Sequence, residues 1–113
     1  MKELKFDYDA EYDDLFIYSD KKSDGSIEIG DFVFDFSNDG ELVAFEIQNA
    51  IKNLNSIAEK PFDNLDKLKS CRIEINTIKD FLILRIELST GKDVIYSNIV
   101  IPSVKEEIPA LGY

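Results

Sequence analysis

The sequence predicts an α+β fold in which an antiparallel β-sheet packs one or two helices on one face. Two observations lead to this fold class. Short segments with alternating apolar and polar residues occupy both ends of the 113-residue chain, whereas helical spacing is confined to its middle. No stretch alternates strand with helix, as a parallel sheet would require. The predicted element order is ββββ-αα-βββ, within a single domain that spans residues 1–113.

Two short strands are predicted at the start of the chain. Apolar side chains alternate with charged ones over residues 4–8, which is the pattern of a half-buried strand. Residues 9–14 form a polar connection, and residues 15–18 (LFIY) favour a second strand. Residues 19–26 contain several charged residues and a glycine, so they are interpreted as a loop.

A hairpin is predicted over residues 32–47. Asp39-Gly40 is expected to form a type I′ turn at its tip, in which both central residues have positive φ. The resulting pairs are Phe36 with Val43, Phe34 with Phe45, and Phe32 with Ile47. All six apolar side chains then share one face, and a slip of one residue would move one strand's set to the polar face.

Helical spacing follows the hairpin. Asn49 is a residue type that caps helices, and apolar residues then recur at intervals of three and four. Pro61 interrupts this pattern. Phe62, Leu65 and Leu68 continue at three-residue spacing and predict a second short helix.

Residues 69–101 are expected to form a second β-meander. Its three strands are predicted at residues 71–75, 81–88 and 94–101. Pro102 ends the last strand, and residues 102–113 are interpreted as a tail.

Composition excludes several kinds of chemistry. The chain has no histidine and one cysteine, Cys71, so the usual zinc, copper and iron ligands and the usual general base are missing. Cys71 begins an apolar strand and is expected to be a buried structural thiol in a reducing compartment. The five glycines are isolated and form no phosphate-binding loop. We therefore expect a protein that has no cofactor and is not an enzyme, because an enzyme would have only carboxylates to work with.

The negative net charge of the chain indicates which kinds of partner it can bind. The formal net charge of −10 disfavours binding to nucleic acid and to anionic membranes, and it favours encounter with basic proteins. Solubility alone is the plainer explanation of the same charge. No segment is apolar enough to span a membrane, and the first 20 residues carry acids where a signal peptide would be apolar, so a cytoplasmic location is expected.

The densest group of acidic residues lies between the first two predicted strands. The expected partner-contact residues are Asp9, Glu11, Asp13 and Asp14. Such a group can form a contact surface for a basic partner or a weak site for a divalent metal. A solvated loop without a function is the alternative, since runs of charge are usually solvated.

Residues 35–46 (DFSNDGELVAFE) match the calcium-binding loop of an EF-hand at several positions. An EF-hand needs flanking helices, whereas the residues before Asp35 alternate as a strand does. In an extended hairpin, Glu46 would lie roughly 20 Å from Asp39. A hairpin is therefore favoured, and a calcium-binding regulatory protein that uses Asp35, Asp39 and Glu46 is the alternative.

Several short motifs suggest a family. They are Tyr8-Asp9, Asp13-Asp14-Leu15, Gly30-Asp31, Asp39-Gly40 and Ala44-Phe45-Glu46. With these motifs, residues 8–53 resemble the domain-of-unknown-function 2283 family of small prokaryotic proteins, although Ala44 stands where the family pattern has glycine. The resemblance implies a β-meander followed by the start of a helix, and it supplies no catalytic residues. It also implies an antitoxin-like role beside a small basic protein.

The sequence thus predicts a small acidic protein-interaction module. Its expected partner is a basic protein or a second copy of the chain, because exposed strand edges make a homodimer a natural arrangement. The sequence does not identify that partner, and it does not establish the order of the strands in the sheet.

Overall fold

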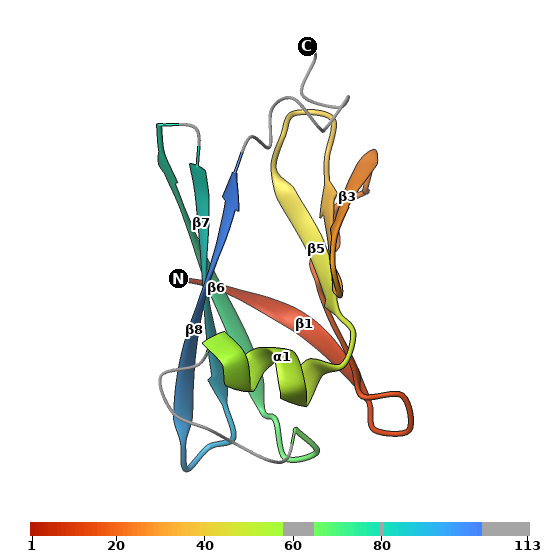
Figure 1. Ribbon diagram of the computed structural model, residues 1–113, viewed down its shortest axis with the longest axis vertical. Coiled ribbons are helices and arrows are strands. Elements are labelled where there is room, and N and C mark those ends of the chain that lie inside the picture. Colours follow the sequence, from red (N-terminus) through yellow and green to blue (C-terminus); the bar gives the residue numbers. More distant parts are fainter. Residues whose placement is uncertain (58–64, 80, 103–113) are drawn as a thin grey trace.

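The computed structural model describes residues 1–57, 65–79 and 81–102. Within them, one antiparallel sheet of eight strands curves around a single short helix, as Figure 1 shows. The elements are β1 (Lys2–Asp9), β2 (Asp14–Tyr18), β3 (Gly25–Ile29), β4 (Phe32–Phe36), β5 (Leu42–Ile47), α1 (Ala50–Ile57), β6 (Ser70–Ile78), β7 (Phe81–Ser89) and β8 (Val94–Pro102). No helix in these ranges is long and apolar enough to cross a membrane. From residue 103 onward, the predicted tail lies outside the described residues.

The predicted order ββββ-αα-βββ is wrong at two places. Residues 25 and 26, the end of the predicted loop, and residues 27–29, for which no element is predicted, form β3, which pairs with β4 and buries Ile27. Leu65 and Leu68 belong to a turn rather than to a second helix, and the Leu68 N–H donates to the Leu65 carbonyl at 3.2 Å. Phe62 lies outside the described residues. The fold is therefore an antiparallel sheet with one short helix, and it is mostly β rather than α+β with two helices.

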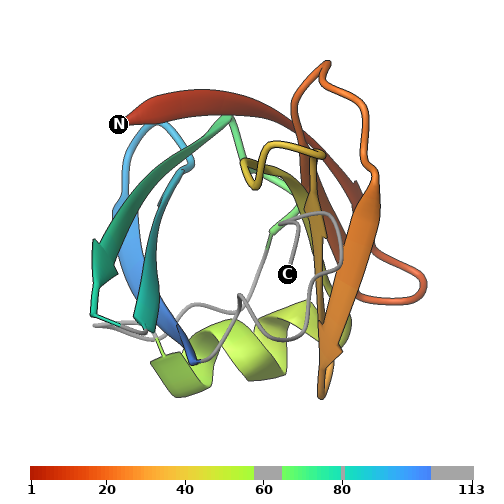
Figure 2. The ribbon, with the colours of Figure 1, turned by 90° about the horizontal axis from the view of Figure 1, so that it is seen from above.

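The first strand joins the two halves of the sheet. Residues 2–4 of β1 pair with β6, and residues 5–9 pair with β2. The strand order is β3-β4-β5-β2-β1-β6-β7-β8, so β3 and β8 are its edges. Seen from above in Figure 2, the sheet forms a half-barrel, and α1 lies across its open side.

The β4–β5 hairpin has the predicted register near its base and a different one near its tip. The confirmed pairs are Phe32 with Ile47 and Phe34 with Phe45. The third predicted pair is wrong, because Phe36 lies opposite Leu42 rather than Val43. The register shifts after Asp35, so β5 contains one extra residue, as in a β-bulge.

The turn at the hairpin tip explains this shift. A type I′ turn needs positive φ at both Asp39 and Gly40, but of these two only Gly40, at 85°, has it. The Ser37 N–H donates to the Glu41 carbonyl at 2.9 Å, and the Gly40 N–H donates to the Ser37 carbonyl at 3.0 Å. Residues 38–40 thus form a three-residue loop with a left-handed glycine, a connection that is typically accompanied by a bulge. The predicted type I′ turn is therefore wrong.

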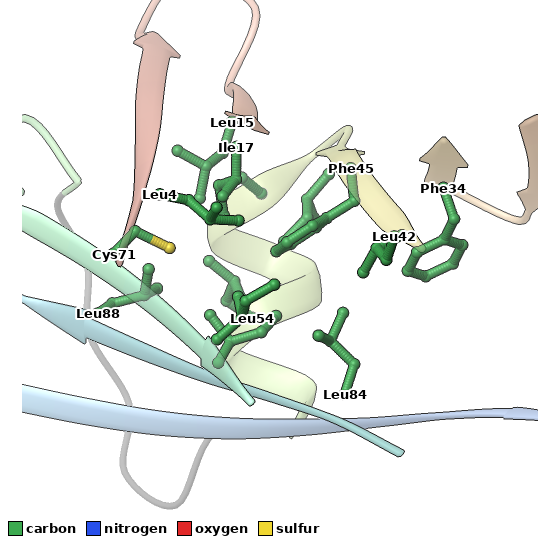
Figure 3. Packing of buried hydrophobic residues seen from close by; sticks show 14 of the residues in the cluster. Leu4, Leu15, Ile17, Phe34, Leu42, Phe45, Leu54, Cys71, Leu84 and Leu88 are labelled. Carbon is green, nitrogen blue, oxygen red and sulfur yellow. The ribbon is translucent and has the colours of Figure 1, made fainter. Parts of the chain in front are cut away.

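The hydrophobic core fills the half-barrel, and α1 completes it. Ala50 and Leu54 of α1 are fully buried. Figure 3 shows Leu54 between apolar side chains from both halves of the sheet. Those that the figure labels nearby include Ile17, Phe45, Leu84 and Leu88. The helix therefore contributes to one core that the two halves share.

Cys71 belongs to this core, as the sequence predicts. Its side chain is fully buried, and burial, with a smaller effect of the Glu87 charge, raises the pKa of the thiol to about 12. A thiol with so high a pKa is a poor nucleophile at neutral pH.

Replacing Leu54 tests the role of α1 in the core. We expect Leu54→Ala to lower the free energy of unfolding by about 2–5 kcal/mol, because it removes buried methyl groups and leaves a cavity. Lys52→Ala, at an exposed position of the same helix, should change it by less than about 0.5 kcal/mol. Urea denaturation measures both. A similar small effect for the two variants would contradict a shared core.

Candidate functional site

Asp13 is part of the structure that holds the start of α1. Its carboxylate oxygens accept hydrogen bonds from the Ile51 N–H at 3.1 and 3.2 Å, and its carbonyl accepts one from the Ala50 N–H at 2.8 Å. The Tyr8 hydroxyl donates to Asp13 Oδ1 at 2.6 Å. A carboxylate at this place satisfies free N–H groups and interacts favourably with the helix dipole. Asp13 is thus engaged inside the protein, although the sequence predicts it as a partner contact.

The predicted helix cap, Asn49, has a different role. Its φ is 51°, and its side-chain amide donates to Asp31 Oδ2 at 3.3 Å. The Asn53 side chain donates to the same oxygen at 3.0 Å. These hydrogen bonds, first from Asn53 and then from Asn49, hold the pKa of Asp31 below its ordinary value. Asp13, between β1 and β2, and Asp31, between β3 and β4, therefore both form hydrogen bonds that fix the start of α1.

Asp9 and Glu11 lie at and beyond the end of β1, in its connection to β2. Asp9 Oδ1 accepts hydrogen bonds from the N–H groups of Glu11, at 3.0 Å, and Tyr12, at 3.3 Å. This is an Asx-turn, in which the side chain shapes its own loop. Glu11 is exposed, and Tyr12 is 71% exposed.

The fourth predicted contact, Asp14, belongs to the outer surface of the sheet. Leu15 and Ile17 of β2 point into the core, so Asp14 and Phe16 point outward. Strand pairing places further carboxylates on the same surface. We define the acidic face as Asp7, Asp14, Glu28, Asp35 and Glu46.

One row of side chains shows how these strands contribute. Across the sheet, Asp7 lies opposite Phe16, Phe16 opposite Glu46, Glu46 opposite Val33, and Val33 opposite Glu28. Phe16 is 37% exposed and stacks on Tyr18 with ring centroids 5.4 Å apart. The acidic face therefore surrounds a partly exposed apolar strip.

Two carboxyl groups of the acidic face are in close contact. A hydrogen bond with Asp14, partial burial, and the negative charges of Asp14, Asp35 and Glu28 raise the pKa of Glu46 to about 7. Asp14 Oδ1 is buried and has no hydrogen-bond partner among the described residues. A proton on Glu46 can supply the donor that the Asp14 carboxyl needs. Near neutral pH, Glu46 is therefore protonated for part of the time, and we interpret this proton as shared with Asp14.

Three lysines of the first half are paired with acids outside the acidic face. Lys5 contacts Asp20 at 2.6 Å, and both Lys2 and Lys21 contact Glu41. Another ion pair joins Arg72 to Glu87. None of these four ion pairs involves a residue of the acidic face. Lys2, Lys5 and Lys21 also line a cavity of about 290 Å³, together with Glu3 and Asp20. Each of these three lysines is already paired with a carboxylate, Lys5 with Asp20 and the other two with Glu41.

The three residues of the calcium-binding alternative do not form an EF-hand loop. Asp35 and Glu46 lie on paired strands, whereas Asp39 lies in the loop at the hairpin tip. The Ser37 hydroxyl donates to Asp39 Oδ1, and this hydrogen bond holds the pKa of Asp39 below its ordinary value. In the part of the chain that the structure describes, no group of three or more Asp, Glu, His or Cys residues is placed to hold a metal ion.

The acidic face is only partly predictable from sequence. Asp14 is among the predicted contacts, and Asp35 and Glu46 appear in the metal alternative. Glu28 is missed, because the strand that presents it is short and no strand is predicted there. The alternation of Ile27 and Ile29 around Glu28 is the signal that marks this strand.

The chain resembles known proteins over most of its length. Residues 5–50 match the family described as "Protein of unknown function (DUF2283)". An uncharacterized protein of Methanocaldococcus jannaschii is 32% identical over 101 residues, which cover 86% of this chain and 84% of that protein. A Methanosarcina mazei protein named "Putative hypoxanthine phosphoribosyltransferase" is 33% identical over 89 residues, which cover 78% of this chain and 69% of that protein. No solved structure matches the chain significantly.

Replacing Asp13 tests its structural role. Asp13→Asn should lower the free energy of unfolding by about 1–2 kcal/mol, because an amide replaces an oxygen that accepts the Ile51 N–H and the charge at the helix start is lost. Asparagine tolerates the φ of 53° at this position. Glu11→Gln, in the same loop, should change the stability by less than about 0.5 kcal/mol. Equal urea midpoints for the two variants would count against the role of Asp13.

Replacing Glu46 tests the shared proton. The pKa of Glu46 is raised from 4.5 to about 7 in the folded protein, so its stabilising effect is complete below about pH 4.5 and is lost as the pH rises through 7. Glu46→Gln removes this titration, and its amide can donate to Asp14. We expect the variant to be more stable than the wild type by roughly 1–2 kcal/mol near pH 8, with a smaller difference near pH 5.

Thermal unfolding across this pH range measures the effect of Glu46→Gln. The matched control is Glu28→Gln, which removes an exposed carboxylate from the same face. The control should show a nearly constant difference from the wild type. A Glu46→Gln variant whose difference from the wild type does not change with pH would refute the shared proton.

Proposed function

The chain belongs to the DUF2283 family, whose members are described as proteins of unknown function, and we propose that it is a non-catalytic cytoplasmic module that binds a basic protein partner. The observation that carries the proposal is the carboxyl pair of Asp14 and Glu46. These groups lie together on the outer surface of the sheet, and the described ion pairs leave them without a cation. A guanidinium or ammonium group from a partner would replace the shared proton and relieve the repulsion between the two carboxylates.

The surroundings of the pair favour arginine as the partner's contact residue. A guanidinium group has a planar set of donors that can bind two carboxylate oxygens at once. It also stacks on aromatic rings, and Phe16 lies beside Glu46 across the strands with part of its ring exposed. Asp7 and Glu28, at the two ends of the same row, extend the negative surface. The same charges disfavour nucleic acids and anionic membranes as ligands.

This proposal changes the expected set of contact residues. Asp14 remains, and Glu46 joins it from the neighbouring strand. Asp9 and Glu11 lie in the adjacent connection and can add long-range attraction. Asp13 leaves the set, because its carboxylate binds the start of α1. Antitoxin-like inhibition of a small basic protein is the most specific form of this function.

The name of the Methanosarcina mazei relative concerns a nucleotide-forming activity. The sequence of this chain gives that activity no support. Its five glycines are isolated and form no loop that could surround a phosphate. The carboxylates of the acidic face would also repel a phosphate group.

Capture from the native host tests the proposal. The tagged protein, purified at low salt, should retain a stoichiometric basic protein that is released by salt and identified by mass spectrometry. Asp14→Asn combined with Glu46→Gln should reduce capture at least tenfold, since it removes both carboxyl groups that would bind the partner's cation. The control is Glu3→Gln combined with Glu74→Gln, which also removes two carboxylates, at exposed positions outside the acidic face.

With the captured protein in hand, the pH dependence of its affinity is the decisive result. Binding of a cation displaces the proton from Glu46, so affinity should rise as the pH increases through about 7, and Glu46→Gln should abolish this rise. Equal capture by the two double variants would refute the proposal. Calcium binding tighter than about 10⁻⁴ M, measured by calorimetry, would instead support the metal alternative.

A further inference from the structure

The strand β3 forms an edge of the sheet that is accessible to a strand of another protein. Among the described residues, its backbone pairs with β4 and with no other strand, and its main contacts are also with β4. Figure 1 shows β3 on the outside of its half of the sheet, apart from α1. The other edge strand, β8, differs, because α1 lies across the open side of the half-barrel and contacts it. An edge strand has unpaired N–H and C=O groups to which a further strand can bind.

The two sides of β3 differ in chemical character. Ser26 and Glu28 lie on the outer side of the sheet, and both are exposed. Ile27 and Ile29 lie on the other side, where Ile27 is buried and Ile29 is 39% exposed. Side chains alternate in the same way along any strand that pairs with β3. An added strand therefore places every second side chain beside a carboxylate and the others beside an apolar surface.

The charges around β3 favour a basic strand. Glu28 belongs to the acidic face, and it takes part in none of the four ion pairs of the described residues. Its charge and that of Asp35 on β4 both contribute to the raised pKa of Glu46, so the negative field of the acidic face extends to this edge. A second copy of the chain would bring like charges to the edge. A basic side chain opposite Glu28 would instead stabilise the pairing of the two strands.

We propose that the edge of β3 binds a strand of the basic partner in which basic residues alternate with apolar ones. The basic side chains extend the row of the acidic face that ends at Glu28, and the apolar side chains pack beside Ile27 and Ile29. Backbone hydrogen bonds along β3 supply affinity, and the alternation supplies specificity. This inference rests on the proposed function, because it specifies how a basic partner binds.

Two synthetic peptides with blocked ends test the alternation. The first repeats arginine and valine in turn over eight residues, and the second has four arginines followed by four valines. We expect the alternating peptide to bind the full chain roughly tenfold more tightly at low salt, measured by calorimetry, because only this peptide, as a strand, places all its arginines on one side. Equal affinities, or no binding of either peptide, would overturn the proposal, since electrostatic attraction alone does not distinguish the two.

Charge reversal tests the contact with Glu28. Glu28→Lys should weaken binding of the alternating peptide by roughly tenfold, because the new lysine lies opposite the arginines of the peptide. The matched control, Glu74→Lys, makes the same charge change at an exposed position of β6 and should weaken binding by less than about threefold. Both variants should keep the circular dichroism spectrum of the wild type. Equal losses of affinity in the two variants would count against binding at β3.

Hydrogen exchange, followed by nuclear magnetic resonance, locates the bound peptide. The amide protons of residues 25–29 that point away from β4 should exchange roughly tenfold more slowly with the alternating peptide bound, whereas those of β8 should not change. A peptide that binds without protecting β3 would overturn strand addition. If that binding were lost in the Asp14→Asn, Glu46→Gln double variant, the proposed function would still stand. Protection of β3 that persists in this variant would support strand addition and count against the role of the carboxyl pair.

Discussion

The carboxylate of Asp13 is the contact on which the arrangement of this protein depends. From the connection between β1 and β2, it accepts hydrogen bonds from the Tyr8 hydroxyl of β1 and the Ile51 N–H of α1. A helix of eight residues is too short to be stable alone, so its position across the open half-barrel must be imposed by such contacts. Asp31 also fixes the start of this helix, because it accepts hydrogen bonds from the side chains of Asn49 and Asn53. With α1 in place, Leu54 can close a core that both halves of the sheet share.

Acidic residues that look alike in the sequence have two different roles: some fix the start of α1, and others lie on the outer surface of the sheet. Asp13 and Asp14 are neighbours, yet Asp13 turns toward the helix while Asp14 points to the outer surface of the sheet. The alternation of side chains in β2 places Asp14 beside Glu46, and this contact raises the pKa of Glu46 to about 7. The motifs that suggest the family therefore mark mainly the fold. Among them, the Asp14–Glu46 pair is the part that is directed to the outside.

How far the sequence predicts this structure depends on the range of the interaction. The β4–β5 pairs near Phe34 and Phe45 and the burial of Cys71 follow from local alternation, and both were predictable. The turn at Gly40 was not, because three-residue and two-residue loops suit the same Asp-Gly pair. Asp13 as the helix cap was also unpredictable, since it lies 38 residues from Ile51. The long-range pairing of β1 with β6, which brings the two halves together, leaves no local signal either.

The central claim is that the outer face carries a carboxyl pair that lacks a cation near neutral pH. Nuclear magnetic resonance can follow the side-chain carboxyl carbon of Glu46 through a pH titration of the free protein, and this measures its pKa directly. We predict a midpoint of about 7, well above the ordinary value of 4.5. A midpoint near 4.5 would show that Glu46 ionises like any exposed glutamate. It would contradict the claim that this pair awaits a basic partner.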